Sequence, residues 1–112
     1  MANASKRKGD AWERLVVRML RAAGFSQAAR LRQTGEHDEG DVGGLAWFAV
    51  ECKDDKSLSP YQMCVQADRE AVAASKPYGV VVRKSPRRVP EDAVVMMSWE
   101  AFVRLAKYLE EV

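Results

Sequence analysis

Two strand-like stretches separated by a helix constrain the fold of this chain most strongly. Residues 45–53 place alternate side chains on two faces of a strand, and residues 78–83 are rich in valine. Between them, Ser59 and Pro60 supply an N-cap and a first helical residue, which predicts a helix to about residue 75. Strands joined through a helix lie parallel in one sheet with a right-handed crossover. The sequence therefore predicts an α/β fold.

The remaining segments add strands and helices to this unit. Apolar residues recur every three or four positions from about residue 10 to residue 23, which predicts an amphipathic helix ended by Gly24. Short strands are predicted at residues 28–33, 41–43 and 93–97. Ser98 is the expected N-cap of a last helix. The residues expected to pack inward from that helix are Trp99, Phe102, Val103, Leu105, Ala106 and Leu109.

The order of these elements predicts the architecture. Helix, three strands, helix, two strands and helix (α-β-β-β-α-β-β-α) make a mixed central sheet of about five strands flanked by helices. At 112 residues the chain is expected to form a single domain over residues 1–112.

Composition excludes several classes of protein. The chain has 47% apolar and 30% charged residues. It has no apolar run of about 18 residues, so no membrane span is expected. Its first eight residues are polar and basic and do not resemble a secretory signal. This difference favours a location in the cytoplasm. Two cysteines and one histidine are too few for a zinc site or a disulfide scaffold. Without a glycine-rich phosphate loop or a Ser/His/Asp set, neither a nucleotide cofactor nor a covalent nucleophile is expected.

Charge is distributed unevenly along the chain, although the net charge is only +2. Residues 1–32 contain eight Lys or Arg and two acids, residues 33–70 contain three bases and nine acids, and residues 71–112 contain seven bases and five acids. Basic flanks around an acidic centre suit a protein that binds a polyanion and keeps carboxylates for metal ions. A randomly charged surface is the alternative.

The acidic centre contains Asp41 in a glycine-rich segment and, ten residues later, Glu51-Cys52-Lys53. Side chains alternate faces along a strand, so Glu51 and Lys53 point the same way, roughly 7 Å apart. If Asp41 lies beside them on a neighbouring strand, two carboxylates converge where oxygen ligands hold a hard divalent cation, with a lysine next to it.

Two points remain open in this pattern. A tight turn at residues 43–44 would pair Asp41 with about residue 46, whereas pairing Asp41 with Glu51 needs a wider bend. Glu13 also has two interpretations. Together with Asp10 it resembles a capping box, in which the glutamate satisfies a helix-end amide. Alternatively, it is a third carboxylate beside Asp41 and Glu51.

Taken together, the motifs resemble the PD-(D/E)XK nuclease superfamily, with Gly40-Asp41 in place of Pro-Asp and Glu51-Cys52-Lys53 as the second half. Within it, the chain resembles the Holliday junction resolvases of archaea and phages. Their opening pattern Lys-Gly-x-x-x-Glu-Arg stands at residues 8–14, and their Arg-x-Ser-Gly stands at residues 32–35 with Thr34 in place of serine. The resemblance covers roughly residues 6–75 and implies a restriction-endonuclease-like core. Residues 66–82 also resemble small phage nucleases.

The resemblance implies a metal site and catalytic roles. Asp41 and Glu51 would bind Mg²⁺, for which Mn²⁺ is expected to substitute, helped by the Cys52 carbonyl and by Glu13 directly or through water. Lys53 would orient the attacking water or neutralise charge on the transition state. The implied catalytic set is therefore Glu13, Asp41, Glu51 and Lys53.

Basic residues are expected to contact DNA phosphates rather than bases, because no interleaving of aromatic and basic residues suggests base readout. Residues 6–8 are either a mobile basic arm or the start of the ordered chain. Thr34 and Gln66 would make secondary contacts near the phosphate. The full expected DNA-binding set is Lys6, Arg7, Lys8, Arg14, Arg30, Arg32, Thr34, Gln66, Arg87 and Arg88.

The predicted function is a metal-dependent endonuclease that resolves Holliday junctions in branched DNA, in the cytoplasm of a cell or of a phage host. Two symmetric cuts require two active centres, so a homodimer is expected. One alternative is a nuclease of the same superfamily that acts on flaps, nicks or duplex ends. The other is a nucleic-acid-binding module without catalysis, in which Glu13 is a helix cap and Asp41, Glu51 and Lys53 are surface charges.

Overall fold

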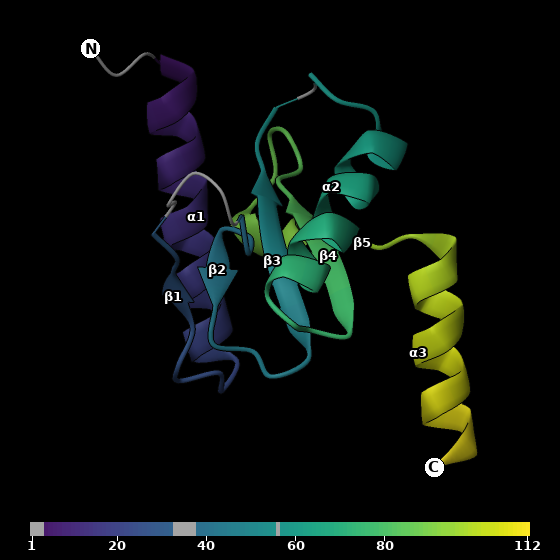
Figure 1. The fold of residues 1–112 in the computed structure, drawn as a ribbon. Coiled ribbons are helices and arrows are strands. Elements are labelled where there is room, and N and C mark those ends of the chain that lie inside the picture. The colour runs from purple at the N-terminus through teal and green to yellow at the C-terminus, as the bar shows by residue number, and fades with distance from the viewer. Residues whose placement is uncertain (1–3, 33–37, 56) are drawn as a thin grey trace.

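A mixed five-stranded sheet forms the centre of the protein, with strand order β1-β2-β3-β4-β5 (Figure 1). The computed structural model describes residues 4–32, 38–55 and 57–112. The strands are β1 (Ala29–Arg30), β2 (Val42–Gly43), β3 (Phe48–Lys53), β4 (Tyr78–Arg83) and β5 (Val94–Met96). The helices are α1 (Ala4–Ala22), α2 (Pro60–Ala73) and α3 (Trp99–Glu111), with a 3₁₀ turn η1 (Pro90–Asp92) before β5. The predicted α/β class and element order are confirmed.

The β3-α2-β4 unit has the predicted parallel crossover. Strands β3 and β4 pair in parallel, with Phe48 opposite Tyr78 and Lys53 opposite Arg83. The other strand pairs are antiparallel. Helix α2 begins with a capping box, because the Ser59 hydroxyl accepts from the Gln62 N–H and the Gln62 side chain accepts from the Ser59 N–H.

Two apolar layers lie on opposite faces of the sheet. On one face α1 packs through Trp12 and Val16 against Val50 and Val80. On the other face α2 packs its own apolar residues against Val81. The indole of Trp12 also donates to the carbonyl oxygen of Val82 over 3.1 Å, so α1 is fixed to β4 by a hydrogen bond as well as by burial. No helix in the described ranges has the length and apolar character needed to traverse a bilayer.

Helix α2 lies unusually close to the sheet at one point. A Cβ atom on Gly79 would lie 2.1 Å from the carbonyl oxygen of Ala67, so only a glycine allows this approach. The contact holds the buried face of α2 directly over β4 and the neighbouring β3.

The first helix is longer than predicted. It begins at Ala4, so Lys6, Arg7 and Lys8 are helical and do not form a separate arm. Asp10 therefore lies well inside the helix rather than at its start, and the capping-box interpretation of Glu13 is wrong. Strands β1 and β3 are shorter than the predicted ranges 28–33 and 45–53.

Helix α3 stands beside the sheet instead of covering it (Figure 1). Ser98 caps it as predicted, because its hydroxyl accepts from the Ala101 N–H. The inward packing predicted for Trp99, Phe102 and Leu109 is wrong, since these side chains are 78%, 49% and 61% exposed. The apolar periodicity of residues 99–109 correctly predicts an amphipathic helix. It does not indicate which surface, if any, covers the apolar side of that helix.

The contact at Gly79 leads to a stability prediction. We expect Gly79→Ala to destabilise the protein by about 1–3 kcal/mol, because the new methyl must push the Ala67 carbonyl and α2 off the sheet. The measurement is urea unfolding followed by circular dichroism. Gly9→Ala is the control: its Cβ meets nothing within 4 Å, and the change in α1 should be neutral or stabilise by about 0.5–1 kcal/mol. Equal effects of the two variants would contradict the tight contact.

Candidate functional site

Asp41 lies opposite Glu51, which settles the open register in favour of the wider bend. Val42 of β2 pairs with Val50 of β3, and the Asp41 N–H donates to the Val50 carbonyl over 2.8 Å. Gly40 makes this approach possible. It has a φ of +103°, and a Cβ there would lie 2.9 Å from the same Val50 oxygen.

The carboxylate of Asp41 is fixed by the backbone of β3. Its Oδ2 accepts the Cys52 N–H over 2.8 Å, and the residue is only 8% exposed. Burial raises the pKa of Asp41 to about 7, with the nearby Glu51 adding to the shift. A raised pKa means that the pocket disfavours this negative charge unless a cation compensates for it.

The main-chain carbonyl of Cys52 points to the β2 side of β3. The carbonyls of Trp47 and Lys53 accept from Tyr78 at the start of β4 and from Lys84 directly after it, and that of Val50 accepts from Asp41. Alternate carbonyls along a strand point to opposite neighbours, so the Cys52 carbonyl points to the β2 side. The Cys52 thiol packs in the α1 core instead, and burial raises its pKa, so it stays a neutral thiol.

Glu51 and Lys53 lie on one face of β3, as the alternation predicts. The Lys53 Nζ is 3.1 Å from Glu51 Oε2, and Glu51 is 4% exposed. Burial, the largest single cause, lowers the pKa of Lys53, but the charge and hydrogen bond of Glu51, together with the charges of Asp41 and Asp55, raise the pKa overall. The lysine therefore stays protonated beside the acid.

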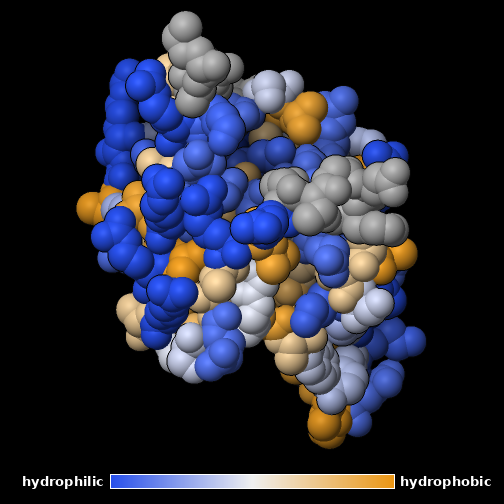
Figure 2. Space-filling model, turned by 60° about the vertical axis from the view of Figure 1, so that its left-hand side comes forward, coloured by the Kyte–Doolittle hydropathy of each residue, from blue (hydrophilic) through white to orange (hydrophobic). Residues whose placement is uncertain are grey.

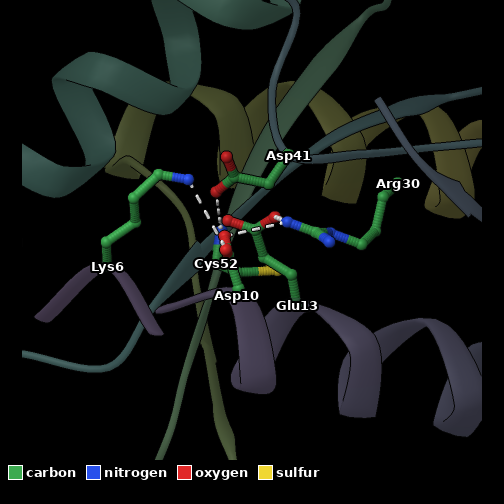
Figure 3. Close-up of polar contacts among 6 residues, drawn as sticks. All are labelled: Lys6, Asp10, Glu13, Arg30, Asp41 and Cys52. Atoms are coloured by element: carbon green, nitrogen blue, oxygen red, sulfur yellow. Dashed lines mark hydrogen bonds and ion pairs between the residues drawn. The ribbon is translucent and has the colours of Figure 1, made fainter. Parts of the chain in front are cut away.

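Glu13 reaches the site from α1, one residue after the buried Trp12. Its Oε1 accepts from Arg30 Nε over 3.0 Å, and Arg30 Nη2 lies 2.9 Å from Asp10 Oδ1. Burial and then the charge of Asp41 raise the pKa of Glu13, so the two carboxylates are electrostatic neighbours. Figure 3 shows Glu13, Asp10 and Arg30 directed toward Asp41 and Cys52.

Glu13, Asp41 and Arg30 border an open cleft of about 670 Å³, whereas Glu51 and Lys53 are not among its lining residues. Lys6 reaches into it from α1, with its Nζ 3.6 Å from Asp10 Oδ2. The lining residues are Lys6, Asp10, Glu13, Arg30, Leu31, Arg32, Asp38, Asp41 and Gln66. The cleft thus combines predicted catalytic acids with four of the predicted DNA-binding residues.

Among the described residues, the other predicted DNA-binding side chains do not line this cleft. Arg14 borders a second groove of about 400 Å³ with Arg18, Arg21 and Arg30. Figure 2 brings the α1 and β1 side forward, and hydrophilic side chains cover much of it. Arg7 is exposed near the start of α1, and Lys8 Nζ is 3.6 Å from Asp54 Oδ1.

The remaining candidates lie farther along the chain. Arg87 and Arg88 are in the loop after β4, where Arg88 Nε is 2.8 Å from Asp92 Oδ2. Thr34 lies outside the described residues. The predicted set therefore divides between the cleft, the groove along α1 and this separate loop.

Two acids near the site were missed from the sequence. Glu70 of α2 is 2% exposed, and burial, followed by Glu51 and Asp38, raises its pKa to about 11. Asp38 also raises the pKa of Asp41. The available signal was the position of Glu70 on the apolar face of α2, three residues after Ala67 and seven after Met63.

The donors around Asp41 suit a hard cation. Within the described ranges, no three Asp, Glu, His or Cys side chains form a ready-made metal cluster. However, Glu51 Oε1 is buried with no hydrogen-bond partner among the described residues, which is an unfavourable state for a carboxylate oxygen. Carboxylate and carbonyl oxygens are the ligands that Mg²⁺ prefers, with water completing its shell. The residues present therefore fit Mg²⁺.

Comparisons with family models, curated proteins and solved structures give no match to this chain.

The raised pKa of Asp41 predicts how metal-free stability depends on pH. The folded protein keeps this proton up to about pH 7, whereas the usual pKa is 3.8, so the free energy of unfolding falls as the pH rises between these values. We expect thermal unfolding in EDTA to show this decline. Asp41→Asn should flatten it, although the raised pKa values of Glu13 and Glu70 leave a residual slope. An Asn variant with the wild-type slope would refute the assignment.

Proposed function

We propose that this protein is a metal-dependent DNA endonuclease that resolves four-way junctions. The observation that supports it best is the convergence of Glu13 from α1, Asp41 before β2, and Glu51 with Lys53 on β3. Carboxylates from separate elements beside a protonated lysine are expected where a phosphodiester is hydrolysed with a hard cation. Surface charges without a shared role have no reason to be buried together.

In this proposal Asp41, Glu51 and the Cys52 carbonyl hold Mg²⁺, and Glu13 contributes directly or through water. When bound, Mg²⁺ acidifies the attacking water and offsets charge on the scissile phosphate. The Cys52 N–H keeps Asp41 Oδ2 in place. Lys53 orients the attacking water or stabilises the negative charge that develops on the phosphoryl oxygens.

The DNA would be held through its backbone. Lys6, Arg32 and Gln66 line the same cleft as Asp41 and would contact phosphates next to the cleaved bond. Arg14, with Arg18 and Arg21, would extend this contact along α1. Phosphate contacts of this kind select DNA by shape and carry no direct sequence information. A branched substrate fits such a surface. Its two symmetric cuts would require two active centres, which a homodimer supplies. The proposed place of action is the cytoplasm.

The deciding experiment uses purified full-length protein and a labelled four-way junction, with Mg²⁺ and with EDTA. A linear duplex of the same sequence is the second substrate. We expect paired cuts in the junction with Mg²⁺ and none with EDTA. Equal cutting of the duplex would favour a nuclease of broader substrate range. Junction binding without any product would favour a binding module.

Two variants test the residue assignment in the same assay. Lys53→Ala and Asp41→Asn should each reduce cleavage by about 10²–10³-fold or more, because the first removes the cation beside the reacting phosphate and the second removes a carboxylate proposed to hold the metal. Junction binding, measured by gel shift, should stay near the wild-type level. Lys107→Ala is the control, since it removes a lysine from the exposed side of α3. Normal cleavage by Lys53→Ala would show that the site is wrongly assigned.

A further inference from the structure

Glu70 is a carboxylate on the buried face of α2. It is 2% exposed and follows Met63 and Ala67 on the helix face that packs against the sheet. The close approach of Ala67 to Gly79 presses this face of the helix onto β4. Glu51 projects from β3 toward the same layer, because the α1 face of that strand carries Val50 and Cys52 instead. The two glutamates therefore meet between β3 and α2.

Three carboxylate oxygens in this layer have no hydrogen-bond partner among the described residues. They are Oε1 of Glu51 and both Oε atoms of Glu70. The other oxygen of Glu51 is occupied by Lys53. Asp38 is the next charged neighbour of Glu70. The pocket thus contains acceptors from three acids. When these acids are ionised, no described residue directs a donor at the three oxygens, and the hydrogen bonds that Glu70 can share with Glu51 and Asp38 require it to stay protonated.

This arrangement is unfavourable without a ligand. Buried acceptors without donors lose their hydration, and like charges at close range repel each other. An ordinary amphipathic helix would carry an apolar residue at this position of its buried face. A divalent cation supplies the missing positive charge and takes several carboxylate oxygens at once.

We infer that Glu70 and Oε1 of Glu51 bind a second divalent cation between α2 and β3, with Asp38 as a further oxygen ligand. The inference depends on the proposed nuclease site, because Glu51 would be shared with the cation held by Asp41. Once cations have displaced the protons of Asp41 and Glu70, five carboxylates face two basic side chains, an excess that one divalent ion does not neutralise. A second ion would make the site positive toward a phosphate, as in other enzymes with paired metal ions. The groups counted are Glu13, Asp38, Asp41, Glu51 and Glu70 against Arg30 and Lys53.

The test is the number of Mn²⁺ ions bound per chain, obtained from the electron paramagnetic resonance signal of the free ion. Wild-type full-length protein should bind two ions, and Glu70→Gln should bind one. The amide of glutamine keeps the shape of the side chain but removes its charge. Asp68→Asn is the matched control on the same helix, because the Asp68 charge acts on Cys64 and not on this layer. This control should still bind two ions.

Thermal unfolding provides a readout that is independent of activity. In EDTA, Glu70→Gln should raise the Tm, because the glutamine amide is neutral at every pH and brings hydrogen-bond donors to oxygens that have no partner among the described residues. With saturating Mn²⁺ the wild-type Tm should rise by more than that of the variant, since the folded wild type binds one more ion. Asp68→Asn should show the wild-type rise.

The outcomes separate this inference from the proposed function. Two ions bound by Glu70→Gln, or a single wild-type ion that Glu70→Gln retains, would overturn the second cation site. Asp41→Asn is expected to lose only the first ion. If it loses that ion while Glu70→Gln loses none, the nuclease site stands and the second cation site fails. If Asp41→Asn keeps both ions and Glu70→Gln loses one, the α2 site stands and the proposed role of Asp41 fails.

Discussion

The hydrogen bond from the Cys52 N–H to Asp41 Oδ2, 2.8 Å long, is the interaction on which the candidate site depends. It joins a carboxylate to the backbone of a central strand, so the position of the acid is set by the sheet and not by a flexible side chain. The adjacent bond from the Asp41 N–H to the Val50 carbonyl fixes the same register. Any slip of β2 by one residue would turn Asp41 to the opposite face, away from Glu51.

The charges around this bond form an inner and an outer group with different physical roles. The inner acids, Asp41, Glu51 and Glu70, are almost fully buried, so their repulsion is poorly screened. At the mouth of the cleft, Arg30 and Lys6 contact Glu13 and Asp10. These outer pairs are partly exposed and weak, so a phosphate could exchange for an acid at modest cost. Arg30 therefore serves first as a counter-charge for the acids, and in the proposed function a phosphate would compete with them for it. The sequence does not reveal the counter-charge role.

Sequence reasoning was accurate where local chemistry decides the structure. Ser59 and Pro60 begin α2 as expected, and the valines of residues 78–83 form β4 in the predicted parallel pairing. The facing of Glu51 and Lys53 followed from strand alternation alone. The pairing of Asp41 could not be predicted, because two glycines at residues 43–44 allow a tight turn as readily as a wider one.

The other errors arise because a periodic pattern reports that a face is apolar but not what covers it. The stripe on α3 was assigned to the core, yet Trp99 is 78% exposed. The converse error concerned Glu70, which was left out of the site although it lies on the buried face of α2. A charged residue in an apolar stripe breaks the local rule, and such breaks are expected at functional or strained positions. Glu70 in the apolar face of α2 is therefore more informative about function than the apolar stripe of α3.

The β3-α2-β4 unit explains why the fold tolerates such unfavourable groups. The same unit that most constrains the topology also supplies Glu51 from its strand and Glu70 from its helix. Met63, Ala67 and Val81 pack tightly beside these acids, and burial of large apolar side chains contributes about 1.5–3 kcal/mol each. An unpartnered buried carboxyl costs a comparable amount, about 1–3 kcal/mol. The apolar packing can therefore hold the acids together, and the proposed second cation would add stability by bonding to their unpartnered oxygens.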